Sequence, residues 1–180
     1  YINRYNNIVY VRNDTNIGAD RNIAKAAFLG HGRYVKLLND NKSINSGVLS
    51  MWKELYSTSS EAVIFNYNYP GKSTMQNTFT KPLGTDKFFY KVSYYLTWLG
   101  GLSFNKELLM QIDPSELDYT TCLVQTEILV KMLKKSGTAK IVYCDWCYEP
   151  KPPKRSGYNY FKVFNNNFVL LLNEAEKSEL

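Results

Sequence analysis

The sequence holds a single histidine and three cysteines among its 180 residues. A Ser/His/Asp or Cys/His catalytic arrangement would have to use His31, which lies between Gly30 and Gly32 without a convincing nucleophile. The odd number of cysteines argues against a framework of disulfide bonds and fits a reducing compartment. We therefore expect a cytoplasmic protein whose chemistry does not use these two arrangements.

Long apolar runs and the common phosphate-binding motifs are absent as well. No run approaches the roughly 20 residues that a membrane-spanning helix requires, and neither G-x-x-x-x-G-K-[ST] nor G-x-G-x-x-G occurs. Cys144 and Cys147 form a C-x-x-C pattern, but zinc would need two more ligands, for which Cys122 and His31 are the candidates. On a strand the two cysteines would point to opposite faces, so we favour a structural role for both.

The net charge of +6 favours anionic partners, such as nucleotide diphosphates, phospholipid head groups or nucleic acid. The basic residues are dispersed, and the densest run, 151–155, is short and interrupted by two prolines. The chain is rich in rings, with 15 Tyr, 9 Phe and 3 Trp. These rings could stack on sugars or nucleobases, or they could pack at the margins of the core.

The first part of the chain predicts a βαβ unit. Residues 8–11 are apolar and β-branched, and residues 34–38 are nearly continuously apolar, which is typical of a strand buried on both faces. Between them, the turn at 13–18 opens a helix that ends at Gly30 and Gly32. Because strands joined by a crossover helix are almost always parallel, we expect a mostly parallel sheet flanked by helices.

The remaining chain alternates between the two periods of regular structure, which indicates an α/β fold. Helices are predicted at residues 43–55, 86–96, 105–110 and 121–135, the first capped by Ser43. Strands are predicted at residues 62–65, 102–104 and 140–148. Residues 66–85 lack a clear period; a stretch of this length is either a functional loop or contains an unrecognised hairpin, and we favour a flexible loop near an active site.

The C-terminal part is set off from the main domain, residues 1–148. Residues 149–157 are rich in Pro and Lys and predict a linker, and residues 158–180 predict a C-terminal amphipathic helix. Its apolar stripe consists of Phe161, Phe164, Phe168, Leu171 and Leu172. The helix would pack on the domain or, alternatively, lie on the inner face of a membrane, since aromatics and lysines suit an interface.

Oxygen-bearing side chains follow directly after the strand predicted at 34–38. They belong to Asn39, Asp40 and Asn41, at a position where the carboxyl ends of parallel strands form the ligand-binding crevice of α/β sheets. A carboxylate assisted by amide oxygens can hold Mg²⁺ or Mn²⁺ while the metal bridges two phosphates. We therefore predict a metal site at Asp40 and Asn41.

Several motifs in this sequence resemble those of the family 2 glycosyltransferases, in particular bacterial enzymes that build O-antigen or capsular polysaccharide. The motifs are Asn16-x-Gly18, Arg21-Asn22, Gly32-Arg33-Tyr34, Leu37-Leu38-Asn39-Asp40-Asn41, Gly100-Gly101 and Phe104-Asn105-Lys106-Glu107-Leu108-Leu109. The resemblance is most specific between Asn13 and Asn41. It implies a partial, Rossmann-like catalytic domain of the glycosyltransferase-A type over residues 1–148.

The resemblance also implies roles for single residues and for partners. A nucleotide-diphosphate sugar donor would be bound by Asn16, Gly18, Arg21, Asn39, Asp40 and Asn41. A saccharide or lipid-linked saccharide acceptor would lie against Gly100 and Gly101. Glu127 or Asp118 would act as the catalytic base of an inverting transfer, with Mg²⁺ or Mn²⁺ at Asp40.

The sequence departs from the family pattern in three places. The nucleoside-binding segment of the family is not found before Tyr1, so we expect an N-terminally incomplete domain. Asn39 and Asn41 stand where acids are usual, which lowers cation affinity. The family's acidic pair corresponds to 125–127, where only Glu127 is acidic. Two other classes of protein therefore stay open: a non-catalytic glycosyltransferase remnant, and a basic, aromatic-rich nucleic-acid-binding module.

Overall fold

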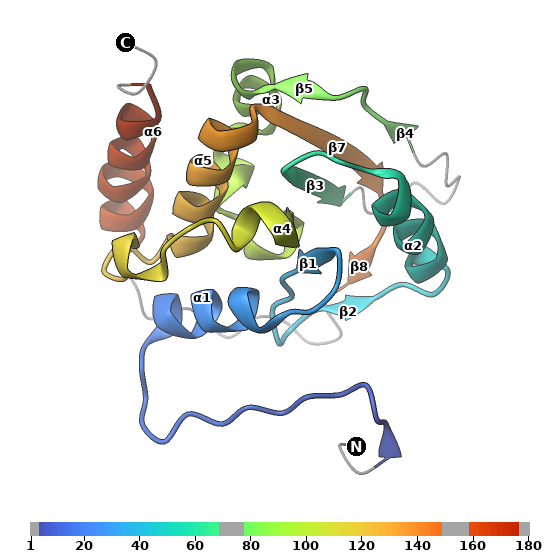
Figure 1. Ribbon diagram of the computed structural model, residues 1–180. Helices are drawn as coiled ribbons and strands as arrows, with labels where there is room; N and C mark the ends of the chain where they lie inside the picture. Colours follow the sequence, from blue (N-terminus) through green and yellow to red (C-terminus); the bar gives the residue numbers. More distant parts are fainter. Residues whose placement is uncertain (1–3, 69–77, 149–158, 177–180) are drawn as a thin grey trace.

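The computed structural model describes residues 4–68, 78–148 and 159–176. It is an α/β fold in which helices flank a six-stranded mixed sheet (Figure 1). The strands of this sheet are β1 (Tyr34–Lys36), β3 (Val63–Asn68), β4 (Thr78–Phe79), β5 (Leu83–Gly84), β6 (Leu102–Asn105) and β7 (Thr138–Cys144). A separate two-stranded sheet pairs β2 (Ser43–Ile44) with β8 (Cys147–Tyr148).

The strand order is β1-β6-β3-β7-β4, and β5 also pairs with β7. Of these pairs, only β3 and β7 are parallel neighbours, so the prediction of a mostly parallel sheet is wrong. The main cause is β6, which lies between β1 and β3 and runs antiparallel to both. β1, β3 and β7 nevertheless run in the same direction, so their carboxyl ends lie at one edge of the sheet.

Successive strand residues point to opposite faces of the sheet, so both faces carry apolar side chains. Helices cover both of these faces. Val35 and Val63 belong to the larger core, which α1, α3, α4 and α5 complete, whereas Tyr34 and Ile64 pack in a smaller core against α2. The helices are α1 (Ala19–Leu29), α2 (Val48–Thr58), α3 (Thr85–Val92), α4 (Lys106–Leu109), α5 (Val124–Ser136) and α6 (Phe168–Glu176). Shorter 3-10 turns cover Ser93–Thr97, Leu99–Gly101 and Pro114–Glu116.

The strand predicted at residues 8–11 does not form. This segment carries no regular structure and runs outside the body of the molecule (Figure 1), with Val9 and Tyr10 76% and 66% exposed. A strand needs a neighbour for its N–H and C=O groups, and among the described strands none pairs with it. The predicted βαβ unit is therefore wrong, although α1 and β1 form where they were expected.

Local sequence explains where several helices begin and end. α4 begins at Asn105, whose Oδ1 accepts two backbone N–H groups of the first turn at 3.1 and 3.3 Å. α5 ends, as predicted, at Gly137, whose φ of +67° is easily reached by glycine. α2 begins after Gly47 and not at Ser43, because Ser43 pairs with β8.

The stretch from 66 to 85 is only partly a loop. β3 continues to Asn68, and both β4 and β5 pair with the edge of β7 that lies opposite β3. The prediction of a flexible loop is therefore wrong for β4 and β5, where backbone groups find partners on β7. Residues 69–77 lie outside the described residues.

The C-terminal helical segment lies beside α5 (Figure 1). It consists of a π-helix, Phe161–Asn167, and α6. Val163 and Leu171 are buried with Leu123, while Phe164 and Phe168 pack partly buried around them. This part of the predicted stripe therefore packs against the residue before α5. The linker predicted at 149–157 lies outside the described residues.

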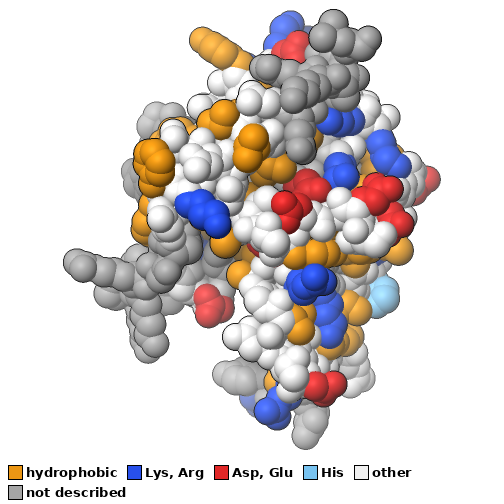
Figure 2. All heavy atoms as spheres, turned by 90° about the vertical axis from the view of Figure 1, so that its left-hand side faces the viewer, with side chains coloured by type: hydrophobic (Ala, Val, Ile, Leu, Met, Phe, Trp, Pro, Cys, Tyr) orange, Lys and Arg blue, Asp and Glu red, His pale blue; other side chains and the backbone are white. Residues whose placement is uncertain are grey.

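Other side chains of this segment face outward: Phe161 is 70% exposed and Leu170 60%. Within the described ranges, no helix combines the length and the apolar composition needed to cross a membrane. On the side of the molecule shown in Figure 2, basic and acidic side chains are intermixed and apolar side chains lie between them. The charge on this side is therefore as dispersed as the sequence indicates.

Candidate active site

Polar and aromatic side chains gather where β1 and β3 end, next to the turns that precede β6 and follow β7. We call this group the strand-end cluster. Its members are Lys36, Asn39, Asn66, Trp98, Gly100 and Trp146. A Cβ atom placed on Gly100 would lie 3.2 Å from the Trp146 ring and 3.3 Å from Asn39 Oδ1. Two residues with predicted donor and acceptor roles, Asn39 and Gly100, therefore lie side by side.

Trp146 is the central ring of the cluster. It is completely buried, and its ring centroid lies 5.5 Å from those of both Trp52 and Trp98. Its Nε1–H donates to the backbone oxygen of Asn66 at 3.1 Å. Both the ring system and the N–H donor of Trp146 therefore have partners within the protein.

Lys36 places a cation among these rings. Its Nζ donates to the backbone oxygen of Gly100 at 2.7 Å and lies 4.2 Å and 4.8 Å from the ring centroids of Trp146 and Trp52. Among the ion pairs of the described residues, none involves Lys36. The residue as a whole is half-buried, but burial of its ammonium end lowers the pKa of Lys36 to about 7.

Within the part of the chain that the structure describes, three amide oxygens in and beside the cluster are buried without a hydrogen-bond partner: Asn39 Oδ1, Asn66 Oδ1 and Gln125 Oε1. The Nδ2 group of Asn66 donates to Ser103 Oγ at 3.0 Å. The Nε2 group of Gln125 donates at 2.9 Å to the backbone oxygen of Thr97, the residue before Trp98. Because buried polar atoms are nearly always paired, these oxygens are candidates for hydrogen bonds with water or with a ligand.

Asp40 and Asn41 form the turn after Asn39, where the N–H of Lys42 donates to the backbone oxygen of Asn39 at 3.1 Å. Across the part of the chain that the structure describes, no three His, Cys, Asp or Glu side chains are grouped so that they could hold a metal ion. Mg²⁺ and Mn²⁺ prefer carboxylate ligands, and this turn offers only the exposed Asp40. The residues of this turn therefore do not fit a divalent cation.

A second polar group joins the starts of α1 and α5, and we call it the helix junction. Its members are Asp20, Arg21, Asp118, Tyr119 and Glu127. The buried carboxylate of Asp20 accepts the N–H groups of Cys122 at 2.7 Å and Val124 at 3.5 Å. Asp20 thus satisfies amides at the start of α5, although burial raises the pKa of its carboxyl group.

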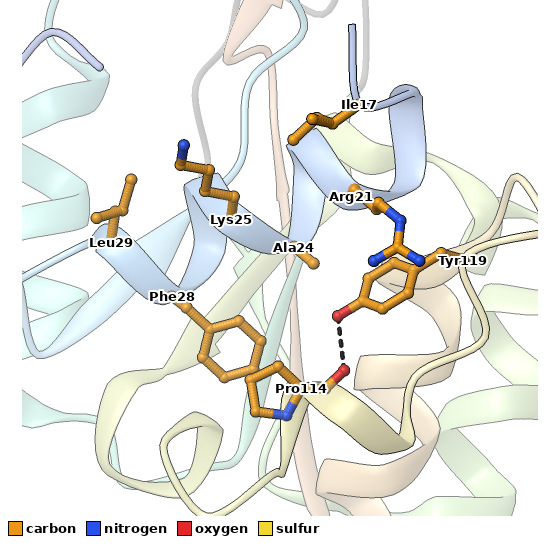
Figure 3. A pocket seen from close by; sticks show the side chains of 8 residues that line it. All are labelled: Ile17, Arg21, Ala24, Lys25, Phe28, Leu29, Pro114 and Tyr119. Atoms are coloured by element: carbon orange, nitrogen blue, oxygen red, sulfur yellow. Dashed lines mark hydrogen bonds between the residues drawn. The ribbon is translucent and has the colours of Figure 1, made fainter. Parts of the chain in front are cut away.

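Arg21 lies in a different environment from the strand-end cluster. Its guanidinium carbon lies 4.4 Å from the centroid of the Tyr119 ring, and the Tyr119 hydroxyl donates to the Pro114 oxygen at 2.6 Å. Both side chains border a mostly apolar cavity of about 520 Å³ (Figure 3), which is also lined by Ile17, Ala24, Lys25, Phe28 and Leu29. Among the described residues, no hydrogen bond or ring contact joins Arg21 to Asn39.

Asn16 and Gly18 shape the turn that opens α1. Asn16 Oδ1 accepts the N–H of Gly18 at 3.0 Å, and Gly18 has a φ of +81°, which side chains disfavour. These contacts give both residues a local structural role. Their predicted role in donor binding stays a prediction.

The two carboxylates predicted as catalytic bases lie together in the helix junction. Glu127 is buried, its Oε2 accepts the N–H of Asp118 at 2.9 Å, and its Oε1 lies 3.8 Å from Lys131 Nζ. Asp118 Oδ1 accepts two bonds from Thr120, which lower the pKa of the Asp118 carboxyl group. Gln125 and Glu127 are two residues apart on α5, so their side chains leave opposite sides of the helix.

The two glycines with predicted acceptor roles differ in what surrounds them. Both are buried in the 3-10 turn before β6. A Cβ atom on Gly101 would lie 2.5 Å from the ring of Phe65, so packing alone requires glycine there. Gly100 instead adjoins Asn39 and accepts the bond from Lys36, which places it in the candidate site.

The cysteine pattern has the structural surroundings that were favoured for it. Cys144 and Cys147 are buried, and none of the three cysteines, all within the described residues, forms a disulfide. Burial raises the pKa of the Cys144 thiol to about 11, which makes it a poor nucleophile or metal ligand at neutral pH.

Sequence reasoning missed Lys36, Asn66 and Trp146. A signal for Lys36 was present, because a lysine inside an apolar strand predicted to be buried on both faces requires a partner. Trp146 gave no such signal, since the rings that surround it come from positions far apart in the sequence.

The sheet is mixed, helices cover both of its faces, and polar residues lie at the carboxyl ends of strands that share one direction. Among solved structures, the chain is similar to S. aureus TarS residues 1–349, crystallised in complex with UDP-GlcNAc. The TM-score is 0.55 at 14% identity, over 84% of this chain and 45% of the TarS chain. The chain thus spans less than half of that TarS chain, and the likeness concerns the fold.

No protein-family model matches the sequence, and no curated protein matches it.

Proposed function

We propose that the chain binds a nucleotide-diphosphate sugar at the strand-end cluster and transfers the sugar, with inversion, to a saccharide or lipid-linked saccharide acceptor. The observation that carries this proposal is the buried, unpaired Oδ1 of Asn39 beside Gly100 at the end of β1. A sugar or ribose hydroxyl is the kind of donor that such an oxygen accepts. The likeness in fold to TarS, which was crystallised with UDP-GlcNAc, supports the same ligand class.

The proposed reaction is a single displacement. The acceptor hydroxyl oxygen forms a bond to the anomeric carbon while the bond from that carbon to the diphosphate oxygen breaks. The nucleoside diphosphate leaves with the electron pair of the broken bond, and the proton of the acceptor hydroxyl passes to a carboxylate. The setting that we propose is the synthesis of cell-surface polysaccharide.

The base is proposed to be Glu127 or Asp118. Glu127→Gln and Asp118→Asn each remove a base while keeping an oxygen that can accept the local hydrogen bonds. The variant of the true base should lower kcat by about 10²- to 10⁴-fold with unchanged donor affinity. If neither variant lowers kcat, both assignments are wrong.

Calorimetric titration with UDP, CDP, GDP and dTDP, each with and without Mn²⁺, tests donor binding. We expect one of these nucleotides to bind with a Kd in the micromolar to millimolar range, which is typical of enzyme substrates. A folded protein that binds none of them would contradict the proposed function. A sugar transfer assay with the nucleotide sugar of the bound nucleotide then tests the enzyme activity.

A non-catalytic protein with a glycosyltransferase fold is the second candidate. It is favoured by the carboxylates of Glu127 and Asp118, which already accept backbone hydrogen bonds, and by the amides at positions 39 and 41. Nucleotide binding without transfer or hydrolysis of any nucleotide sugar would select this candidate. The nucleic-acid-binding class gains no support, because Trp146 is buried and the face in Figure 2 mixes both signs of charge.

Peripheral membrane contact through the C-terminal segment is part of the proposal. Phe161, Val169 and Leu170 are exposed on that segment and could insert between lipid head groups. Flotation with anionic vesicles tests this contact, and Leu170→Glu should reduce it.

A further inference from the structure

We propose that Lys36 supplies the positive charge that holds the donor diphosphate, so that donor binding needs no divalent cation. This inference rests on the proposed function, because it assigns a donor-binding residue within the same site. Lys36 lies in β1, and its ammonium group would take the place of a bound metal cation.

The first argument is the unmatched charge of Lys36. The Nζ group has three N–H donors, of which one is bonded to the Gly100 oxygen at 2.7 Å. The ring faces of Trp146 and Trp52 surround it at 4.2 and 4.8 Å. Burying a cation is costly unless an anion or further hydrogen bonds compensate for the lost water. No carboxylate in the described residues forms an ion pair with Lys36, so an anionic ligand is the partner that this arrangement lacks.

The second argument is the position of Lys36 relative to Asn39. Lys36 Nζ bonds to the backbone oxygen of Gly100, and the unpaired Asn39 Oδ1 lies 3.3 Å from the position that a Cβ atom on the same residue would take. A cation and a hydrogen-bond acceptor thus both lie next to one glycine. A nucleotide sugar carries the matching groups, since its diphosphate is anionic and its sugar rings carry hydroxyl donors.

The third argument is the donor set of the neighbouring turn. Asp40 is exposed and is the only carboxylate among residues 39–41. An Mg²⁺ or Mn²⁺ site would need more oxygen ligands of negative charge than this turn provides. Lys36 carries the same sign of charge at the same strand end, and lysine is a common point-charge partner of phosphate groups.

Lys36 could instead serve packing alone, and substitution distinguishes the two roles. Lys36→Met keeps a stem of similar length against the rings but removes the charge. Lys36→Arg keeps the charge. Lys53→Met is the matched control, because Lys53 is exposed on α2 and its substitution removes one positive charge at the surface.

The experiment is calorimetric titration of each full chain with the nucleotide diphosphate that the wild-type protein binds best, in EDTA and in Mn²⁺. We expect wild-type affinity to differ less than threefold between EDTA and Mn²⁺. Lys36→Met should weaken binding at least tenfold, Lys36→Arg less than Lys36→Met, and Lys53→Met by less than twofold. Binding that requires Mn²⁺, or wild-type affinity in Lys36→Met, would overturn the inference while leaving the proposed function standing.

Failure of the proposed function gives a different result, because the wild-type protein would then bind no nucleotide in either condition. Urea unfolding and the near-ultraviolet circular dichroism of the tryptophans show whether Lys36→Met is folded. If that variant does not fold, two measurements still test the role of Lys36. They are the wild-type affinity in EDTA and in Mn²⁺, and the affinity of Lys36→Arg. A Mn²⁺ requirement would then overturn the inference, and metal-independent binding retained by Lys36→Arg would support it.

Discussion

The strand-end cluster and the helix junction use polar groups in opposite ways. In the helix junction, the carboxylates of Asp20, Asp118 and Glu127 all accept backbone N–H groups. In the strand-end cluster, the oxygens of Asn39 and Asn66 are buried without a partner. The three carboxylates of the helix junction therefore stabilise local structure, whereas the strand-end cluster holds buried amide oxygens for which the described residues offer no hydrogen bond.

The largest effect is expected from removing the central ring of the strand-end cluster. Trp146→Ala deletes a completely buried side chain that contacts Trp52 and Trp98, and it should lower the free energy of unfolding by about 3–5 kcal/mol. Urea unfolding measures the loss. Tyr148→Ala is the control, because that ring is 54% exposed. Equal effects of the two substitutions would contradict the packing described for the cluster.

The helix junction should lose stability without losing ligand affinity. Asp20→Ala removes the acceptor for two amides at the start of α5 and should cost about 1–3 kcal/mol in urea unfolding. Nucleotide affinity should change by less than twofold in the same variant. Asp14→Ala, at an exposed position before α1, should leave both quantities unchanged. A large loss of nucleotide affinity in Asp20→Ala would show that the helix junction also contributes to ligand binding, which contradicts the contrast between the two regions.

The strand-end cluster should show the reverse behaviour. Asn39→Ala removes an oxygen that has no partner among the described residues, so the free energy of unfolding should change by less than about 0.5 kcal/mol. Nucleotide-sugar affinity should fall about tenfold, which corresponds to about 1.4 kcal/mol. Asn7→Ala, at an exposed position in the segment before α1, is the control. Unchanged affinity in Asn39→Ala would remove Asn39 from the site.

A further expected effect is a dependence of stability on pH. The pKa of Lys36 falls from 10.5 to about 7 in the folded protein, so above pH 7 the unfolded chain holds a proton that the folded chain has lost. The contribution of Lys36 to stability should therefore rise with pH between 7 and 8.5.

Urea unfolding of the wild-type protein and Lys36→Met across this window measures that contribution. The nearby Cys144, Tyr34 and Tyr56 have pKa values raised to about 11, 12 and 12 and do not titrate there. Identical slopes in the two proteins would show that the ammonium end of Lys36 is hydrated.

Much of the fold could be predicted from the sequence because local periodicity determines it. α1, β3 and α5 lie close to their expected positions, with Gly137 ending α5. The place of β6 could not be predicted, since the choice of a strand's neighbours depends on distant segments. The strand expected at 8–11 shows the same limit, because its sequence suits a strand but no described neighbour pairs with it.

The candidate site was predictable in part. The position of Asn39 after an apolar strand indicated a ligand site, and Asn39 does lie beside Gly100. The surroundings of Lys36 were not predictable, because Trp52 and Trp146 contact it from segments that lie far apart in the sequence. In the sequence, Asp118 and Glu127 were candidates for the catalytic base. In the structure, their carboxylate oxygens accept backbone hydrogen bonds.

The position of β6 gives the site a direct connection to the centre of the sheet. β6 pairs with β1 on one side and β3 on the other, and the Gly100 oxygen that accepts the Lys36 bond lies two residues before its start. Ligand binding that immobilises Gly100 should therefore slow opening of the whole strand. Amide hydrogen exchange along Leu102–Asn105 would then report occupancy of a site that these residues need not touch.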